Sequence, residues 1–267
     1  MVVSGAPWWR GAPHVLVTGT SGAIGSAIAR KIRARAPGAK LTLLDVAIER
    51  SERLAEELSA DRAKARVVPC DLSKPAAIPA ALRDATDHYG PIAGLVNCAG
   101  FMEVRRFESI EWARAEALLM VDLVSPLRLM HATTAGMLDA RWGFVVNVAS
   151  MAGKVTLRGC AFYCAAKAGI AAASEVARRE LGPHGVRVVT VYPGPVHSEL
   201  ETKARDQYGR GVLSRILPTG DPRALARLTM DAVEQDRPRV IYPSLYSIGT
   251  LPFASPLALA FGPSATG

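Results

Sequence analysis

The sequence predicts an α/β protein built on a doubly wound parallel sheet, in three layers with about seven strands. Short apolar segments of strand length alternate with longer amphipathic segments, which favours parallel strands joined by helices. Several apolar segments run directly into glycine, asparagine or aspartate, as strands do where they enter a loop. The expected strands cover residues 14–18, 40–44, 67–72, 94–97, 145–149, 186–191 and 240–243.

A single domain spanning residues 1–267 is expected. The chain is 49% apolar and contains neither an internal repeat nor a proline- and serine-rich linker, so its length suits one sizeable core. Residues 1–11 form an N-terminal extension that lacks the apolar stretch of a signal peptide. Residues 245–267 form an apolar tail that Pro252 and Pro256 interrupt, so it is too broken for a spanning helix. This tail predicts a subunit contact or, at most, a peripheral contact with a membrane.

The charge and the cysteines argue against two classes of function. A net charge of +8 permits contact with nucleic acid, but the basic residues are scattered and never form a run of five. A solvated basic surface is therefore favoured over a nucleic-acid interface. The four cysteines have neither Cys-x-x-Cys nor zinc-finger spacing, so no metal site is expected. A chain of this length does not need disulfides, and reduced thiols indicate a cytoplasmic protein.

A glycine-rich turn follows the first expected strand. Residues 19–25 read Gly-Thr-Ser-Gly-Ala-Ile-Gly and lead into an amphipathic helix over residues 26–35. Glycines let the backbone approach a pyrophosphate, and a helix N-terminus supplies unpaired N–H groups and partial positive charge. A strand, a glycine turn and a helix in this order therefore indicate a dinucleotide site. The competing interpretation is a tight turn without a ligand.

Asp45 ends the second expected strand, twenty positions beyond Gly25. A carboxylate there can accept the hydrogen bonds of an adenosine ribose and repels a 2′-phosphate. No arginine or lysine occurs in the glycine turn or directly after Asp45, so NAD is favoured over NADP. Alternatively, Asp45 caps the turn that follows it.

A serine, a tyrosine and a lysine stand at suggestive spacings in the middle of the chain. Tyr163 and Lys167 are four positions apart in an alanine-rich segment, so a helix would project both from one face. A free phenol titrates near ~10, and a neighbouring ammonium stabilises its phenolate form. Ser150 lies thirteen positions before Tyr163 and directly after an expected strand. The alternative is that a Tyr-x-x-x-Lys pair arises by chance.

The combination of Ser150, Tyr163 and Lys167 resembles the catalytic core of the short-chain dehydrogenase/reductases. The resemblance implies a Rossmann fold and the common single-domain branch of that family. It also implies that Tyr163 exchanges a proton with the substrate oxygen while Ser150 hydrogen-bonds that oxygen. Lys167 would lower the pKa of Tyr163 and bind the nicotinamide ribose.

The same resemblance implies the cofactor-binding residues. Its common branch has the pattern Thr-Gly-x-x-x-Gly-x-Gly, whereas here Ala23 takes the middle glycine position and Gly22 precedes it. This spacing is similar to the epimerase and dehydratase branch, but the later motifs follow the common one. The implied cofactor positions are Gly19, Ser21, Gly22, Ala23, Ile24, Gly25, Asp45, Asp71, Leu72, Asn97, Ala99, Gly100, Tyr163, Lys167, Pro193, Gly194, Val196 and Ser198.

Asp122 is a second departure from the family pattern, which has asparagine at this catalytic position. In the family, the helix kinks here and the residue helps to hold a water that links the lysine to solvent. An aspartate keeps the size of asparagine but adds a negative charge near Lys167, which would favour the protonated lysine. Whether this charge tunes or damages activity stays open at this point.

The expected function is reversible hydride transfer between NAD(H) and a secondary alcohol or ketone. Residues 199–217 are expected to form a substrate lid, and this lid with the apolar tail favours a steroid-, retinoid- or lipid-like substrate. The small side chains of the helix after Tyr163 favour a homodimer or homotetramer. The alternatives are a 3-oxoacyl-carrier-protein ketoreductase, a nucleotide-sugar epimerase, and a non-catalytic NAD-binding scaffold.

Overall fold

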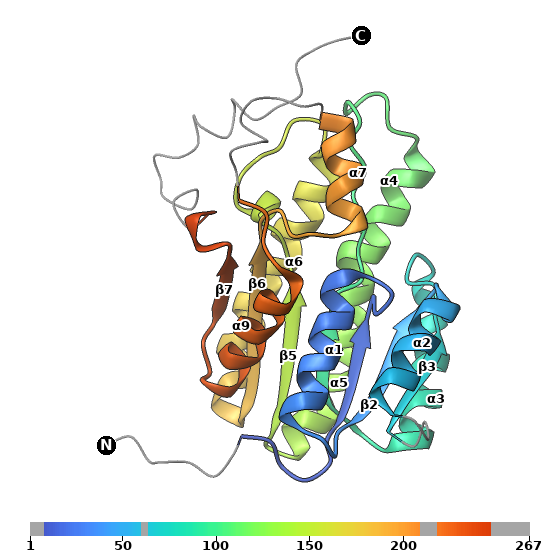
Figure 1. Ribbon diagram of the computed structural model, residues 1–267, viewed down its shortest axis with the longest axis vertical. Helices are drawn as coiled ribbons and strands as arrows, with labels where there is room; N and C mark the ends of the chain where they lie inside the picture. Colours follow the sequence, from blue (N-terminus) through green and yellow to red (C-terminus); the bar gives the residue numbers. More distant parts are fainter. Residues whose placement is uncertain (1–7, 60–63, 209–217, 247–267) are drawn as a thin grey trace.

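The computed structural model describes residues 8–59, 64–208 and 218–246 and contains one seven-stranded parallel sheet between two layers of helices (Figure 1). The strand order is β3-β2-β1-β4-β5-β6-β7, which confirms the predicted doubly wound, three-layered α/β fold. The strands are β1 (His14–Thr18), β2 (Lys40–Asp45), β3 (Ala65–Pro69), β4 (Ile92–Asn97), β5 (Gly143–Val148), β6 (Val186–Pro193) and β7 (Arg239–Tyr242).

The strands are apolar on both sides because helices cover both faces of the sheet. Every residue of β1 and of β5 is buried. In β1, Val15 and Val17 belong to one core cluster, while Leu16, which points to the opposite face, belongs to the other. Neighbouring strands run in register, with Val15 opposite Leu41 of β2 and Gly94 of β4.

The helices divide between the two faces of the sheet. Side chains of α1, α2 and α9 contribute to the core on one face, and those of α3, α5 and α6 contribute to the core on the other. The helices are α1 (Ala23–Arg35), α2 (Ile48–Leu58), α3 (Ile78–Tyr89), α4 (Trp112–Leu119), α5 (Ser125–Asp139), α6 (Ala161–Leu181), α7 (Glu199–Tyr208) and α9 (Pro222–Glu234). Short 3-10 helices cover Pro75–Ala77, Met151–Gly153 and Gly182–His184.

Several element boundaries differ from the sequence expectation, and two of them lie beside expected cofactor positions. The third strand ends at Pro69 rather than at residue 72, because the chain turns at Asp71. There the Asp71 carboxylate accepts the N–H of Ser73, and the Asp71 carbonyl accepts the N–H of Lys74. The first helix begins at Ala23, three positions earlier than expected, so the last part of the glycine turn is already helical.

A π-helix over Met120–Val124 joins α4 to α5. This wide turn contains Asp122, at the position where the family resemblance implies a kinked helix. The extra residue per turn rotates the chain between α4 and α5, and Asp122 is buried while its neighbours on both sides are not.

The order of the strands reverses next to β1. The chain proceeds from β1 through β2 to β3 on one side, and β4 then pairs with β1 on the other side. Ligands of such sheets bind at the carboxyl ends of the strands, beside this switch point. In the part of the chain that the structure describes, no helix is long and apolar enough to cross a membrane. Residues 1–7, 209–217 and 247–267, which include parts of the expected extension, lid and tail, lie outside the described residues.

Candidate active site

The glycine turn after β1 is packed directly against the end of β4. Gly19 has a left-handed backbone with φ of 70°, and a Cβ atom on it would lie 2.7 Å from the Cα of Ala99. A Cβ atom on Gly25 would collide with the carbonyl oxygen of Gly19. The hydroxyl of Thr18 accepts the N–H groups of Cys98 and Ala99, both at 3.0 Å, and so ties the two strand ends together. Side chains at Gly19 and Gly25 would therefore open this turn.

The N-terminus of α1 suits an anionic ligand. Gly22 is the residue before the helix, no side chain caps it, and the first turn contains no acidic residue. The N–H groups of a first helical turn have no partner within the helix and carry partial positive charge. The shifted spacing of this chain puts Ala23 at the first helical position. The residues present thus fit the pyrophosphate of a dinucleotide, which the turn and the helix N-terminus would hold.

Asp45 lies at the end of β2, against the glycine turn. One carboxylate oxygen accepts the N–H of Ser21 at 2.8 Å, and the other accepts the Ser21 hydroxyl at 3.1 Å and the N–H of Ala47 at 2.9 Å. The structure therefore shows the turn-capping role considered for Asp45, and the hydrogen bonds to an adenosine ribose stay a prediction.

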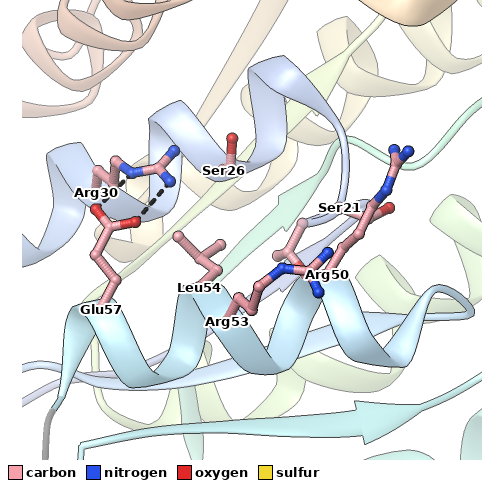
Figure 2. A pocket seen from close by; sticks show the side chains of 8 residues that line it. Ser21, Ser26, Arg30, Arg50, Arg53, Leu54 and Glu57 are labelled. Carbon is pink, nitrogen blue, oxygen red and sulfur yellow. Dashed lines mark hydrogen bonds and ion pairs between the residues drawn. The ribbon is translucent and has the colours of Figure 1, made fainter.

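Arginine side chains gather next to this position, and sequence reasoning missed them. A pocket between α1 and α2 is lined by Ser21, Arg30, Arg50 and Arg53 among others, as Figure 2 shows. Arg30 is paired with Glu57 at 2.7 Å within the pocket. Arg50 is paired with Glu199 of α7, also at 2.7 Å. Arg50 and Arg53 are three positions apart, so the sequence could have shown that they share one face of a helix. Their nearness to Ser21 depends on how α2 packs, which the sequence does not show.

Ser150, Tyr163 and Lys167 come together at the carboxyl end of β5. Ser150 follows β5, its hydroxyl accepts the N–H of Ala152 at 3.1 Å, and its influence on the Tyr163 phenol lowers the pKa of that group. Helix α6 carries Tyr163 and Lys167 one turn apart, with the Lys167 Nζ 5.6 Å from the centre of the Tyr163 ring. Both side chains are buried. The expected i, i+4 pairing on one helical face is therefore the observed geometry.

Asp122 forms an ion pair with Lys167 at 2.7 Å. The other oxygen of the carboxylate accepts the N–H of Phe101 at 3.2 Å, and the Lys167 ammonium also donates to the carbonyl of Val148 at 3.1 Å. A Cβ atom on Gly100 would collide with the Asp122 carboxylate. The pair thus connects the ends of β4 and β5 with α6.

The pKa shifts of these three groups follow from burial and from their mutual contacts. Burial raises the pKa of Tyr163, Lys167 opposes the rise, and Asp122 adds to it. Burial lowers the pKa of Lys167, but attraction to Asp122 and Tyr163 outweighs burial and the net direction is upward. Burial likewise raises the pKa of Asp122 against the pull of Lys167. Lys167 thus acts on Tyr163 in the expected direction, yet the net pKa of the phenol is raised.

A buried polar network braces the centre of the sheet, and two of its members were not predicted. The side-chain amide of Asn97 donates to the Asn147 carbonyl oxygen on the adjacent strand at 2.8 Å. Asn147 in turn donates to the Ser174 hydroxyl on α6 at 2.8 Å. All three side chains are buried. Asn147 lies in the apolar strand that precedes Ser150. A polar amide among apolar strand residues needs hydrogen-bond partners, so the sequence could have indicated this network.

Three further predicted cofactor residues have structural partners of their own. The Asp71 carboxylate accepts the Ser73 hydroxyl at 2.7 Å, a hydrogen bond that lowers its pKa, and the Leu72 carbonyl accepts the Ser125 hydroxyl at 2.6 Å. The Ser198 hydroxyl accepts the N–H of Glu201 at 3.1 Å and so caps α7. Because the Ser198 hydroxyl acts as an acceptor in this hydrogen bond, its O–H group can still donate another.

The loop after β6 connects this edge of the sheet to the chain that follows α7. Pro193 ends β6, and the N–H of Gly194 donates to the carbonyl of Tyr242 at 2.8 Å. Val196 is buried and forms a parallel bridge with Gly220. No contact recorded between described residues joins this loop to Tyr163 or Lys167, so the implied cofactor-binding role of Val196 and Ser198 stays a prediction.

Comparison with known proteins agrees with this geometry. The family model described as short chain dehydrogenase matches residues 13–209. D-threitol dehydrogenase of Mycolicibacterium smegmatis is 35% identical over 205 residues, which cover 77% of this chain and 78% of that protein. The 3-oxoacyl-(acyl-carrier-protein) reductase FabG of Vibrio cholerae is 33% identical over 216 residues, covering 79% of this chain and 85% of that protein.

A solved structure extends the comparison to three dimensions. A short-chain dehydrogenase from Streptomyces avermitilis superposes with a TM-score of 0.77 at 26% identity, and the match covers 91% of this chain and 92% of that one. The family model covers well over half of the chain, and the sheet is the Rossmann-type nucleotide-binding sheet that the sequence predicted. The protein therefore belongs to the short-chain dehydrogenase family of oxidoreductases.

Proposed function

We propose that the protein interconverts a secondary alcohol and a ketone by hydride exchange with NAD(H). The observation that carries this proposal is the grouping of the half-buried Ser150 with the buried Tyr163 and Lys167 at the same edge of the sheet as the glycine turn. A bound nicotinamide would supply the hydride acceptor or donor.

The roles of the side chains follow from their hydrogen-bonding capacity. The Tyr163 phenol can take a proton from an alcohol oxygen or return it to a ketone oxygen, and the Ser150 hydroxyl can donate to that oxygen as negative charge develops. Two of the three N–H groups of the Lys167 ammonium are committed to Asp122 and Val148. The third is left for a ribose hydroxyl.

Asp45 supports NAD as the cofactor, whereas the arginines beside it support NADP as the competing choice. The Asp45 carboxylate offers ribose hydroxyls two acceptor oxygens and repels a 2′-phosphate. Arg50 and Arg53 line the neighbouring pocket and would attract that phosphate. We favour NAD because Asp45 is buried and touches the glycine turn, while the exposed Arg50 is already paired with Glu199.

Replacing Asp45 with serine tests the choice of cofactor. The variant loses a charged hydrogen-bond acceptor and the repulsion of a 2′-phosphate, so the ratio of kcat/KM for NAD to that for NADP should fall by at least about tenfold. Asp84→Ser is the matched control, because it removes an exposed carboxylate of α3 that pairs with Arg66 of β3, and it should leave the ratio unchanged. A wild-type preference for NADP would contradict our assignment.

The surroundings of Tyr163 support an apolar substrate of steroid, retinoid or lipid type. Tyr163 belongs to a cluster of apolar side chains from α4, α6 and the loop after β4, and it has no charged neighbour other than Lys167 and Asp122 among the described residues. The partly buried members of this cluster include Phe101, Met102, Val104, Leu119, Leu157 and Phe162. Since the relatives include a polyol dehydrogenase and an acyl-carrier ketoreductase, a polar or a carrier-bound substrate is the alternative.

A substrate panel tests the activity itself. Purified protein is incubated with NAD or NADP and a set of steroid alcohols, long-chain secondary alcohols and polyols, and formation of the reduced nicotinamide is followed by absorbance. We expect the highest kcat/KM with an apolar secondary alcohol. Cofactor binding without turnover on any alcohol, or on ketones in the reverse direction, would instead identify a non-catalytic scaffold.

We also propose a cytoplasmic location and a homo-oligomeric state. The location is supported by Cys70, Cys98 and Cys164, which form no disulfide with one another among the described residues. The assembly is supported by large apolar side chains left exposed on one face, including Phe107 and Trp112.

A further inference from the structure

The pair formed by Asp122 and Lys167 is unusual in this molecule because both charges are buried. The exposed fraction of the side chain is 0% for Asp122 and 6% for Lys167. The other ion pairs recorded between described residues retain at least 19% exposure on each partner. Removing two charges from water is costly, and replacing such a pair by neutral groups is often neutral or stabilising. A gain in stability is therefore a poor explanation for this pair.

The backbone holds the carboxylate in one position. The π-helix over Met120–Val124 carries Asp122 inward, and its two oxygens are bound separately by the N–H of Phe101 and by the Lys167 ammonium. Gly100 has no side chain, which lets its backbone lie against both charged groups. Gly100 is also one of the residues expected to leave room for the cofactor. The pair thus lies behind the surface on which a nicotinamide would rest.

The charges of this cluster sum to zero. Lys167 contributes one positive charge, Asp122 one negative charge, and the buried Tyr163 phenol is neutral when protonated. The other titratable groups that interact with these residues are the Cys98 thiol after β4 and the Cys160 thiol before α6. Burial raises the pKa of Cys98 to about 12, so this thiol is neutral as well. With a neutral side chain at position 122 and Lys167 still protonated, the same cluster would carry a net charge of +1.

We propose that Asp122 is a specificity-determining residue that makes the nicotinamide subsite electroneutral and thereby favours the cationic oxidised cofactor over the neutral reduced cofactor. The inference rests on the proposed function, because it assumes that a nicotinamide binds beside Lys167. The oxidised and reduced rings have nearly the same shape but differ by one unit of charge. A lone buried ammonium repels only the oxidised ring, and the Asp122 carboxylate cancels this repulsion. The protein would accordingly be biased toward alcohol oxidation.

Equilibrium binding tests this proposal without any turnover. The dissociation constants of NAD+ and NADH are measured by fluorescence titration for the wild type, Asp122→Asn and Asp231→Asn, each checked for folding by circular dichroism. Asp231→Asn is the matched control, because it removes the same charge from α9, where Asp231 pairs with Arg35 of α1. If the protein binds NADP+ and NADPH more tightly than NAD+ and NADH, the titrations are made with NADP+ and NADPH instead.

We expect the two dissociation constants to change by different factors, so that their ratio changes. In Asp122→Asn, the ratio of the dissociation constant for NAD+ to that for NADH should rise by about tenfold, while Asp231→Asn should leave it unchanged. Lys167→Gln should shift the ratio in the opposite direction, which gives a second test if Asp122→Asn fails to fold. An unchanged ratio in a folded Asp122→Asn or Lys167→Gln variant that binds both forms would overturn the inference. Failure of the folded wild type to bind either form would refute the proposed function instead.

Discussion

At the scale of single residues, the acidity of Tyr163 is set by three competing influences. Burial raises its pKa most, Lys167 lowers it, and Asp122 raises it again. The phenol must be deprotonated to accept a proton from an alcohol, so a raised pKa moves alcohol oxidation toward higher pH. Asp122 therefore has two effects: it makes Tyr163 less acidic, and it cancels the positive charge of Lys167.

The pH profile of alcohol oxidation should report this balance. Asp122→Asn removes a negative charge that raises the pKa of Tyr163, so the ascending limb of log kcat against pH should move to lower pH, by about one unit. Turnover at neutral pH should be retained or increased. An unmoved profile would show that Asp122 does not set the pKa of Tyr163. A collapse of activity across the pH range with folding intact would show that the carboxylate has a separate role in the chemistry.

At the scale of elements, the register of the sheet is reinforced by a buried histidine at the start of β1. The Nδ1 of His14 lies 2.8 Å from the carbonyl oxygen of Gly90, and its Nε2 lies 2.8 Å from the hydroxyl of Thr42 on β2. A carbonyl only accepts hydrogen bonds, so Nδ1 carries the proton and Nε2 accepts from Thr42. Burial lowers the pKa of His14, because the charged form loses its water.

This histidine makes the stability of the sheet dependent on pH. The unfolded chain binds a proton near the ordinary histidine pKa of 6.5 while the folded state does not, so the free energy of unfolding should fall as the pH drops below 6.5. The loss is at most about 1.4 kcal/mol per pH unit. Urea unfolding of the wild type, His14→Gln and the exposed control His131→Gln between pH 7.5 and 5.5 measures it. The slope should flatten in His14→Gln only, and equal slopes in all three would refute this account.

The sequence predicted most of these elements because the strands are short, apolar and followed by glycine or polar residues. The glycine turn and the pairing of Tyr163 with Lys167 depend on local spacing, which a sequence displays directly. The contacts of Asn147 with Ser174 and of Arg50 with Glu199 join residues far apart in the chain, and only the packed structure reveals them. The upward shift of the Tyr163 pKa was missed for the same reason, since the degree of burial of a single phenol depends on its tertiary surroundings.

At the scale of the whole molecule, aromatic side chains remain exposed beside α4 and the start of α6. Phe107 and Trp112 have exposed fractions of 69% and 67%, and both rings contact the ring of Phe162, which precedes Tyr163. Exposed aromatic clusters favour association, because burying them removes a large apolar area from water. A second copy of the chain is the partner that we propose for this face.

The oligomeric state tests that proposal. We expect the wild type to sediment as a dimer or tetramer and Phe107→Ser/Trp112→Ser to dissociate, lowering the measured mass at least twofold at micromolar concentration. Val46→Ser, which removes a side chain of comparable exposure after β2, should leave the mass unchanged. A monomeric wild type would contradict the proposal.

The central claim is that Tyr163 exchanges the proton while a bound nicotinamide exchanges the hydride. Single-turnover measurement of Tyr163→Phe tests it most directly, with dissociation constants of the cofactor measured on the same protein. The phenyl ring fills the same buried space but has no proton to exchange. We predict a rate at least about 100-fold below that of the wild type, with cofactor affinity changed by less than about threefold. A rate close to that of the wild type would contradict the account.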